Sequence, residues 1–193
     1  MGRKEEGCPV APLRRILSPV VQPGNDSRSQ TRCKPIMTSD PNINSRADDE
    51  LLLKSAKFSV VRTKTIDRHG RPATKDVIRH PSAVVILPVF EDDRICLIRN
   101  HRITVGQDLL EAPAGTLDSG ESPLQCAYRE LTEETGYCAG NMHPLGWFYL
   151  SPGILDERMH LFLATDLTEG QRNLMPDEHI VNEIVHLEAA LEL

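Results

Sequence analysis

The sequence predicts an α+β fold built around a mixed β-sheet. Three observations lead to this prediction. Short β-branched and apolar runs suited to strands outnumber helical segments, only one long amphipathic helix is evident, and no regular alternation of strand and helix appears. The chain has 193 residues, of which 39% are hydrophobic and 26% charged, as expected for one globular domain with an extension.

The first segment is expected to be a disordered, basic extension covering residues 1–56. Its first 50 residues are rich in Pro, Ser, Asn and Arg and show no sustained apolar period. Met37 opens the stretch that leads into the folded region, so it is a candidate for the true start. The domain is therefore expected to span 57–193, with a short C-terminal helix that suggests a truncated end.

Strands are predicted where β-branched or apolar runs lie between turn residues. In chain order these runs are 57–66, 74–79, 83–90, 94–98, 109–112, 146–150, 159–166 and 183–187. Residues 67–70 suit a turn between the first two runs, and 83–90 is continuously apolar, as in a strand buried on both faces. A second helix is expected to begin near Glu188.

One helix carries complete start and stop signals between Ser122 and Gly136. Ser122 suits the N-cap, Pro123 suits the first helical position, and Gln125 completes a capping box. Gly136 suits the position just beyond the last turn. Helical periodicity places four residues on the face expected to enter the core: Leu124, Ala127, Tyr128 and Leu131.

The adjoining face of this helix presents three carboxylates, those of Glu130, Glu133 and Glu134. Their mutual repulsion needs compensation, and an ion pair from Arg129 to Glu133 stabilises a helix by only about 0.2–0.5 kcal/mol. A hard divalent cation such as Mg²⁺ or Mn²⁺ prefers carboxylate oxygens and would compensate more strongly. The competing interpretation is a solvated acidic helix face.

A wider pattern favours the metal site. Five residues separate Gly115 from Glu121, and seven separate Glu121 from Arg129, which opens the run Arg-Glu-Leu-Thr-Glu-Glu-Thr-Gly-Tyr ending at Tyr137. This pattern matches the Nudix box at every defining position, so the protein resembles a Nudix hydrolase. The resemblance implies an α/β/α sandwich around a mixed sheet. It also implies Mg²⁺-dependent hydrolysis, with Mn²⁺ as a substitute, of a nucleoside diphosphate linked to another group.

The resemblance also implies roles for individual residues. The implied metal ligands are Glu130, Glu133, Glu134, Glu178 and the carbonyl oxygen of Ala114. The implied catalytic residues are Glu133, Glu134, Glu178 and Arg129, which orients the carboxylates. The general base stays open between Glu178, Asp177, Glu133 and a metal-activated water that needs little help. The reason is that Pro176 stands where the family has a second glutamate.

Flanking segments resemble the ADP-ribose pyrophosphatase subfamily. Residues 110–115 read Leu-Glu-Ala-Pro-Ala-Gly, residues 151–153 read Ser-Pro-Gly, and Pro152 lies fifteen residues beyond Tyr137. This resemblance implies a set of substrate-binding residues: Arg102, Glu111, Ser151, Gly153 and Glu157. Among them Arg102 is suited to a bidentate grip on the diphosphate, and the last three are expected to line the pocket of the terminal ribose.

The expected reaction is hydrolysis of ADP-ribose to AMP and ribose 5-phosphate by a cytoplasmic homodimer. The alternatives are another nucleotide sugar such as GDP-mannose, or a regulator that binds ADP-ribose without cleaving it. Nucleic acid is not an expected partner, because 22 Lys and Arg against 28 Asp and Glu give a net charge of −6. A membrane is not expected either, since the apolar run 83–90 is far shorter than the ~20 residues of a spanning helix. Five cysteines without a C-x-x-C pair indicate a reducing compartment.

Overall fold

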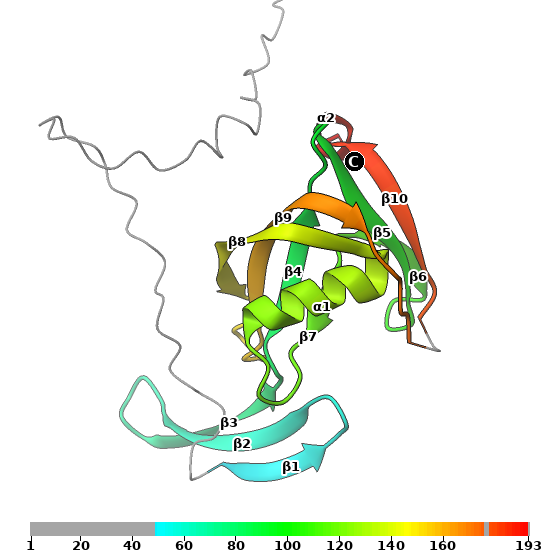
Figure 1. The fold of residues 1–193 in the computed structure, drawn as a ribbon. Coiled ribbons are helices and arrows are strands. Elements are labelled where there is room, and N and C mark those ends of the chain that lie inside the picture. The colour runs from blue at the N-terminus through cyan, green and yellow to red at the C-terminus, as the bar shows by residue number, and fades with distance from the viewer. Residues whose placement is uncertain (1–48, 176–177, 193) are drawn as a thin grey trace, which may run out of the picture. The chain divides into compact units, whose positions relative to one another are not determined.

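The computed structural model of the protein describes residues 49–175 and 178–192. Met37, Asp177 and nearly all of the expected extension lie outside these residues. The elements in chain order are β1 (Glu50–Lys54), β2 (Ser59–Ile66), β3 (Pro72–Arg79), β4 (Ala83–Pro88), β5 (Arg94–Arg102), β6 (Gln107–Glu111), β7 (Ala114–Thr116), α1 (Pro123–Thr135), β8 (Tyr137–Tyr149), β9 (Arg158–Glu169), β10 (Ile180–His186) and α2 (Leu187–Ala190) (Figure 1). In this part of the chain, the helices are all too short or too polar to pass through a bilayer.

The described strands form three sheets, and one of them is mixed. That sheet has the order β7-β4-β9-β8, in which β9 runs parallel to β4 and antiparallel to β8. The other two sheets are antiparallel, with the orders β10-β5-β6 and β1-β2-β3. The α+β class with a mixed sheet is therefore confirmed.

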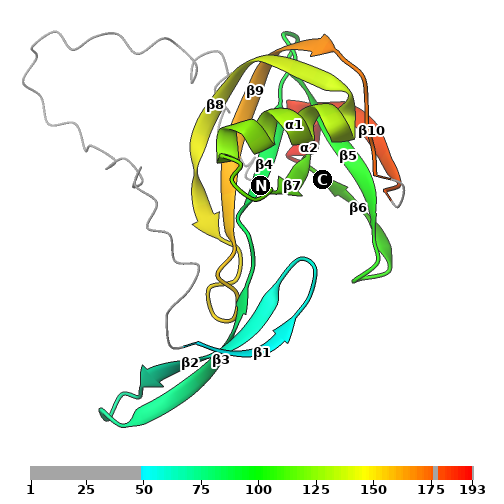
Figure 2. The ribbon, with the colours of Figure 1, turned by 60° about the horizontal axis from the view of Figure 1, so that its bottom comes forward.

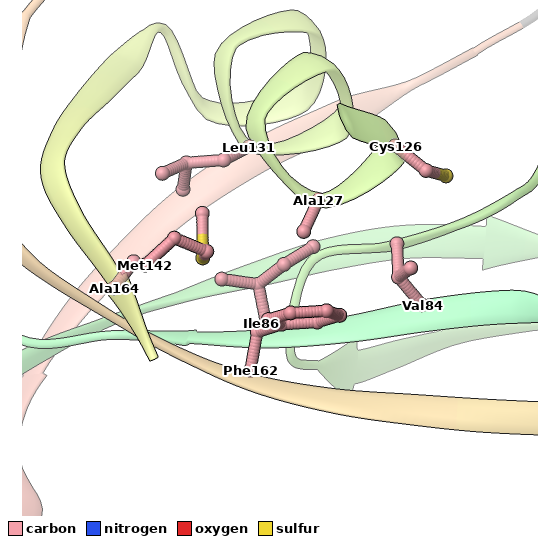
Figure 3. Close-up of a cluster of buried hydrophobic side chains, with 8 residues drawn as sticks. All are labelled: Val84, Ile86, Cys126, Ala127, Leu131, Met142, Phe162 and Ala164. Carbon is pink, nitrogen blue, oxygen red and sulfur yellow. The ribbon is translucent and has the colours of Figure 1, made fainter. Parts of the chain in front are cut away.

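Helix α1 contacts both the mixed sheet and the sheet of β10, β5 and β6. It packs on β4, β7 and β8 and also contacts β5 and β10, and Figure 2 shows it lying across β4 between these strands. A cluster of buried side chains fills the space between α1 and the mixed sheet (Figure 3). Its members are Val84 and Ile86 from β4, Cys126, Ala127 and Leu131 from α1, Met142 from β8, and Phe162 and Ala164 from β9. Burial of this apolar surface fixes α1 against the sheet.

The buried face of α1 differs from the expected one. Leu124 is 45% exposed and Tyr128 is 38% exposed, so the prediction that they enter the core is wrong. The side facing the sheet instead follows Ala127, Leu131 and Glu134, at positions i, i+4 and i+7, all buried. The core face is therefore rotated towards the carboxylates, and that of Glu134 lies inside the protein.

Three stretches of strand were not expected from the sequence. β1 precedes residue 57, β7 lies inside the box loop, and β8 extends over 13 residues, of which only 146–149 were predicted. The remaining strands and α1 confirm the predicted runs to within a few residues at each end. The second helix, α2, covers four residues, Leu187–Ala190.

The sheet of β1, β2 and β3 is poorly buried among the described residues. All of β1 is exposed, with Leu51 at 57% and Leu53 at 51%, whereas Val61 of β2 is buried. Arg79, at the end of β3, forms ion pairs with Asp49 (2.9 Å) and Asp156 (3.0 Å). These pairs anchor one end of the sheet, while the leucines of β1 remain open to solvent.

Candidate active site

The catalytic candidates of the box lie on a helix whose ends are both capped. The Ser122 hydroxyl accepts a hydrogen bond from the Gln125 backbone N–H (3.3 Å), and the Gln125 side chain accepts one from the Ser122 backbone N–H (3.0 Å). Gly136 ends the helix with φ 78°, a left-handed conformation that glycine adopts at little cost. The capping box and the terminal glycine are thus confirmed.

Glu134 points into the protein rather than into solvent. Its side chain Oε2 accepts a hydrogen bond from the Ala114 backbone N–H at 2.9 Å, and the residue is 4% exposed. Burial raises the pKa of Glu134 to about 8, and the nearby charges of Glu130 and Glu178 act in the same direction. The structure therefore brings Glu134 and Ala114, two of the implied ligands, into direct contact.

Gly115 is needed for space beside Glu130. A Cβ atom on Gly115 would lie 2.0 Å from the Cδ atom of the Glu130 side chain, far inside any van der Waals contact. The backbone of Gly115 lies in β7 and pairs with Val84 of β4. Glycine at the start of the box is thus explained by the close approach of a carboxylate to the backbone.

Arg129 holds the other carboxylates of the box together. It donates from Nε and Nη2 to Glu121 (2.9 and 2.8 Å) and from Nη1 to Glu130 (2.7 Å) and Glu133 (3.0 Å). Its Nη2 also donates to the carbonyl oxygen of Thr116 (3.2 Å). The guanidinium lowers the pKa of Glu121 to about 2. For Glu130, burial raises the pKa, and Arg129 opposes that effect.

The carboxylates share one side of α1 but are held by protein partners. Glu130 and Glu133 turn towards Arg129, whereas Glu134 turns towards Ala114. In the ranges 49–175 and 178–192, no three Asp, Glu, His or Cys side chains are arranged to hold a metal ion. The available donors are nonetheless carboxylate oxygens next to a backbone turn, which suit a hard divalent cation, and the buried Glu134 would gain most from one.

Arg102 and Glu111 form a bidentate pair. Arg102 donates from Nε and Nη2 to the two carboxylate oxygens of Glu111, at 2.6 to 3.1 Å. The charges of Glu134 and Glu178 also help to raise the pKa of Arg102, so this guanidinium lies within electrostatic reach of the box. The structure thus joins two of the residues expected to bind substrate, Arg102 and Glu111, in one ion pair.

Glu178 is close enough to the box for its charge to affect two of the carboxylates. Its side chain accepts a hydrogen bond from the Met175 backbone N–H at 2.9 Å. Its negative charge raises the pKa of both Glu130 and Glu134. Asp177, the neighbouring candidate for the base, lies outside the described residues.

The residues expected around the terminal ribose form a second group. Ser151 and Gly153 are exposed, whereas Glu157 is 8% exposed, and burial raises its pKa. The Glu157 carboxylate lies 3.2 Å from Nδ1 of His80, a residue that the sequence did not single out.

Asp156 and Glu121 both line a hollow of about 850 Å³ that also borders the β1–β2 turn. None of the three metal candidates on α1 lines this hollow.

Arg172 and Asn182 are further residues near the site that the sequence did not single out. Arg172 donates to the carbonyl oxygen of Glu134 (2.6 Å), and Asn182 donates to that of Thr135 (2.7 Å). Arg172 follows β9 and Asn182 belongs to β10, and both strands are far along the chain from α1. No local sequence pattern marks such a contact.

Comparison with known proteins places the chain in a family. Residues 79–193 match the model of the NUDIX domain, and the chain therefore belongs to the Nudix hydrolases. It is 37% identical over 148 residues to an ADP-ribose pyrophosphatase of Bacillus subtilis, covering 72% of this chain and 80% of the relative. It is also 37% identical over 133 residues to a GDP-mannose pyrophosphatase of Citrobacter koseri, covering 61% of this chain and 67% of the relative.

A solved structure supports the same assignment. The crystal structure of an ADP compounds hydrolase superposes with a TM-score of 0.67 at 25% sequence identity, covering 76% of this chain and 80% of that chain. The predicted family, the enzyme class and the Nudix type of sandwich are thereby confirmed.

Proposed function

We propose that this enzyme hydrolyses the diphosphate bond of ADP-ribose, giving AMP and ribose 5-phosphate. The observation that carries the proposal is the intact box, folded so that Arg129 joins Glu121, Glu130 and Glu133 beside the buried Glu134. The relative from Bacillus subtilis, an ADP-ribose pyrophosphatase with 37% identity, supports the choice of substrate.

Mg²⁺ is the proposed cofactor, with Mn²⁺ as a substitute. Glu130, Glu133, Glu134 and Glu178 would hold the metal together with the Ala114 carbonyl oxygen, since hard cations select oxygen ligands. When bound, the ion would neutralise diphosphate oxygens and acidify a water molecule for attack on phosphorus.

Other residues of the protein would orient the carboxylates and bind the diphosphate and the terminal ribose of the substrate. Arg129 orients the box carboxylates through its fork of N–H groups. Arg102 uses Nε and Nη2 for Glu111, and an arginine has further N–H donors with which to grip the diphosphate. Ser151, Gly153 and Glu157 are proposed to bind the terminal ribose, where a carboxylate accepts hydrogen bonds from sugar hydroxyls.

A homodimer is the proposed assembly. Leu51 and Leu53 expose more than half of their surface on a three-stranded sheet, and such a sheet gains stability when its apolar face is covered. A second copy of the chain is the occupant that the family resemblance favours.

One second candidate has a specific observation in its favour. The GDP-mannose pyrophosphatase of Citrobacter koseri is also 37% identical to this chain. Measuring kcat/KM for ADP-ribose, GDP-mannose and other nucleotide sugars separates the two candidates. A higher kcat/KM for GDP-mannose would overturn the ADP-ribose assignment.

The variant Glu134→Gln tests the metal site. Glutamine keeps a carbonyl oxygen that can accept the Ala114 N–H, so folding should survive, but it cannot ionise to bind a cation as a carboxylate does. We expect kcat to fall roughly 10²- to 10³-fold with a small change in KM, as for a lost transition-state contact. Glu188→Gln, at an exposed position of α2, is the matched control and should leave kcat unchanged. An unchanged kcat in Glu134→Gln would refute the assignment.

A further inference from the structure

The C-terminal turn of α1 is held by a segment that follows β9. The last carbonyl groups of a helix lack partners within the helix and need them from elsewhere. Here three consecutive carbonyl oxygens accept hydrogen bonds from residues far along the chain. The bonds are Asn173 N–H to Glu133 (3.2 Å), Arg172 Nε to Glu134 (2.6 Å) and Asn182 Nδ2 to Thr135 (2.7 Å).

Arg172 is the central member of this arrangement. Its Nε donates to the Glu134 carbonyl oxygen, and its Nη2 donates to Oδ1 of Asn182 at 3.1 Å. One planar guanidinium therefore connects the end of α1 to β10. Its positive charge also lies at the negative end of the helix dipole, where a cation is stabilising. A lysine could supply the charge, but it could not span both acceptors in one plane.

The segment that contains Arg172 leads directly to Glu178. Backbone contacts continue along it, since the Glu178 N–H donates to the carbonyl oxygen of Met175 (3.0 Å). The negative charge of Glu178 helps to raise the pKa of both Glu130 and Glu134. Arg172 thus lies where the chain carrying Glu178 joins the helical turn carrying Glu133 and Glu134.

We infer that Arg172 is a positioning residue that sets the separation between the carboxylates of α1 and Glu178, and thereby the affinity for the divalent cation. This inference rests on the proposed function. It assigns Arg172 no contact with the substrate, because its donors are directed at the Glu134 carbonyl oxygen and at Asn182. Its effect passes through the backbone of α1.

A residue that only stabilised the fold would behave differently. Its loss would lower the free energy of unfolding but leave the metal affinity of the folded protein unchanged. Loss of a positioning residue weakens cation binding in the folded protein, and outer partners of metal ligands typically change metal affinity 10- to 100-fold. The two roles are therefore separated by measuring metal binding and stability on the same variants.

The experiment compares wild type, Arg172→Ala, Arg172→Lys and Arg99→Ala in the full chain. Arg99 of β5 pairs with Glu183 of β10 at 2.5 Å, so its loss removes an arginine contact to β10 without touching α1. Mn²⁺ binding is measured without substrate from the EPR signal of the free ion, and urea unfolding is measured in parallel. The Mg²⁺ dependence of kcat with ADP-ribose is then recorded for each variant.

For Arg172→Ala we expect Mn²⁺ affinity to fall at least tenfold, and half-maximal activity to require correspondingly more Mg²⁺. Arg172→Lys should lie between Arg172→Ala and wild type, and it also serves if the alanine variant fails to fold. Arg99→Ala should bind Mn²⁺ as wild type does. If Arg172→Ala and Arg172→Lys bind Mn²⁺ as tightly as Arg99→Ala, the inference fails while the proposed function stands. If wild type itself binds no Mn²⁺, the proposed function and this inference both fail.

Discussion

Gly115 and Glu130 show how closely side chains of the box approach the backbone. The Glu130 carboxylate occupies the place where a side chain on Gly115 would begin. The atom that would clash is the end of a flexible side chain, so the protein can relieve the clash by moving the carboxylate. The cost of a side chain at position 115 should therefore appear in catalysis more than in folding.

We expect Gly115→Ala to lower kcat roughly 10- to 100-fold, the range seen when a metal ligand is disturbed, while the urea midpoint changes little. Steady-state kinetics and urea unfolding of the same preparation provide the check. A large loss of stability would show that the backbone of β7, rather than Glu130, had moved. Wild-type kcat would show that the position of Glu130 does not matter.

Glu121 makes folding depend on pH in the acid range. Arg129 lowers the pKa of Glu121 from its ordinary value of 4.5 to about 2. A carboxyl group with a lowered pKa in the folded state stabilises the protein above pH 4.5, and this contribution is lost as the pH falls towards 2. Glu121→Gln removes the contribution.

Wild type should therefore be more stable than Glu121→Gln at pH 7, and the difference should shrink as the pH is lowered through 4.5 to 3. Urea unfolding at several pH values measures it, with Glu188→Gln as the exposed control. A difference that stayed constant from pH 7 to 3 would argue against the ion pair with Arg129 as its source.

At the scale of elements, α1 depends on its capping box. Ser122 and Gln125 satisfy each other's backbone N–H groups at the start of the helix. Ser122→Ala should lower the free energy of unfolding by about 1 kcal/mol, because the N–H of Gln125 loses its acceptor. Urea unfolding tests this, and Ser119→Ala, an exposed serine of the preceding loop, is the control. Equal midpoints for the two variants would contradict the capping role.

Elements that carry local sequence signals were predicted correctly. Elements that depend on pairing with distant strands were missed. α1 was predicted because its signals are local: Ser122 and Gly136 flank it directly, and its apolar residues recur at helical spacing. β8 was predicted only from Gly146 onwards, because Gly140 and Pro144 disfavour a strand. In the structure β8 still pairs with β9 along its length, with an irregularity between Pro144 and Gly146. β7 has three residues and no apolar run, so only its pairing with β4 makes it a strand.

The same contrast applies to the site. The box residues are recognised by their spacing, and the structure brings Arg129, Glu130 and Glu134 to one helix. The orientation of each carboxylate depends on partners such as the Ala114 N–H, which no spacing predicts. The pairs Glu157–His80 and Arg172–Glu134 join residues far apart in the chain, and only the folded structure reveals them.

At the scale of the whole molecule, the exposed leucines of the β1-β2-β3 sheet are the proposed contact with a second copy. If that copy covers Leu51 and Leu53, replacing both with lysine should convert a dimer into a monomer, since two charges would have to be desolvated at the interface. Analytical ultracentrifugation measures the change. Leu145→Lys, at an equally exposed leucine of β8, is the control and should leave the mass unchanged. A double variant that remains dimeric would place the interface elsewhere.

The parallel pairing of β4 with β9 has a consequence for protein synthesis. β4 lies near the start of the Nudix domain, but its neighbour β9 is among the last strands to be made, with Ala83 opposite Met159. During synthesis, β4 therefore cannot pair with β9 until about 70 further residues have left the ribosome. During that interval β4, one of the most hydrophobic strands, is exposed on the nascent chain. The yield of folded protein in cells should therefore depend on chaperones that bind such exposed segments.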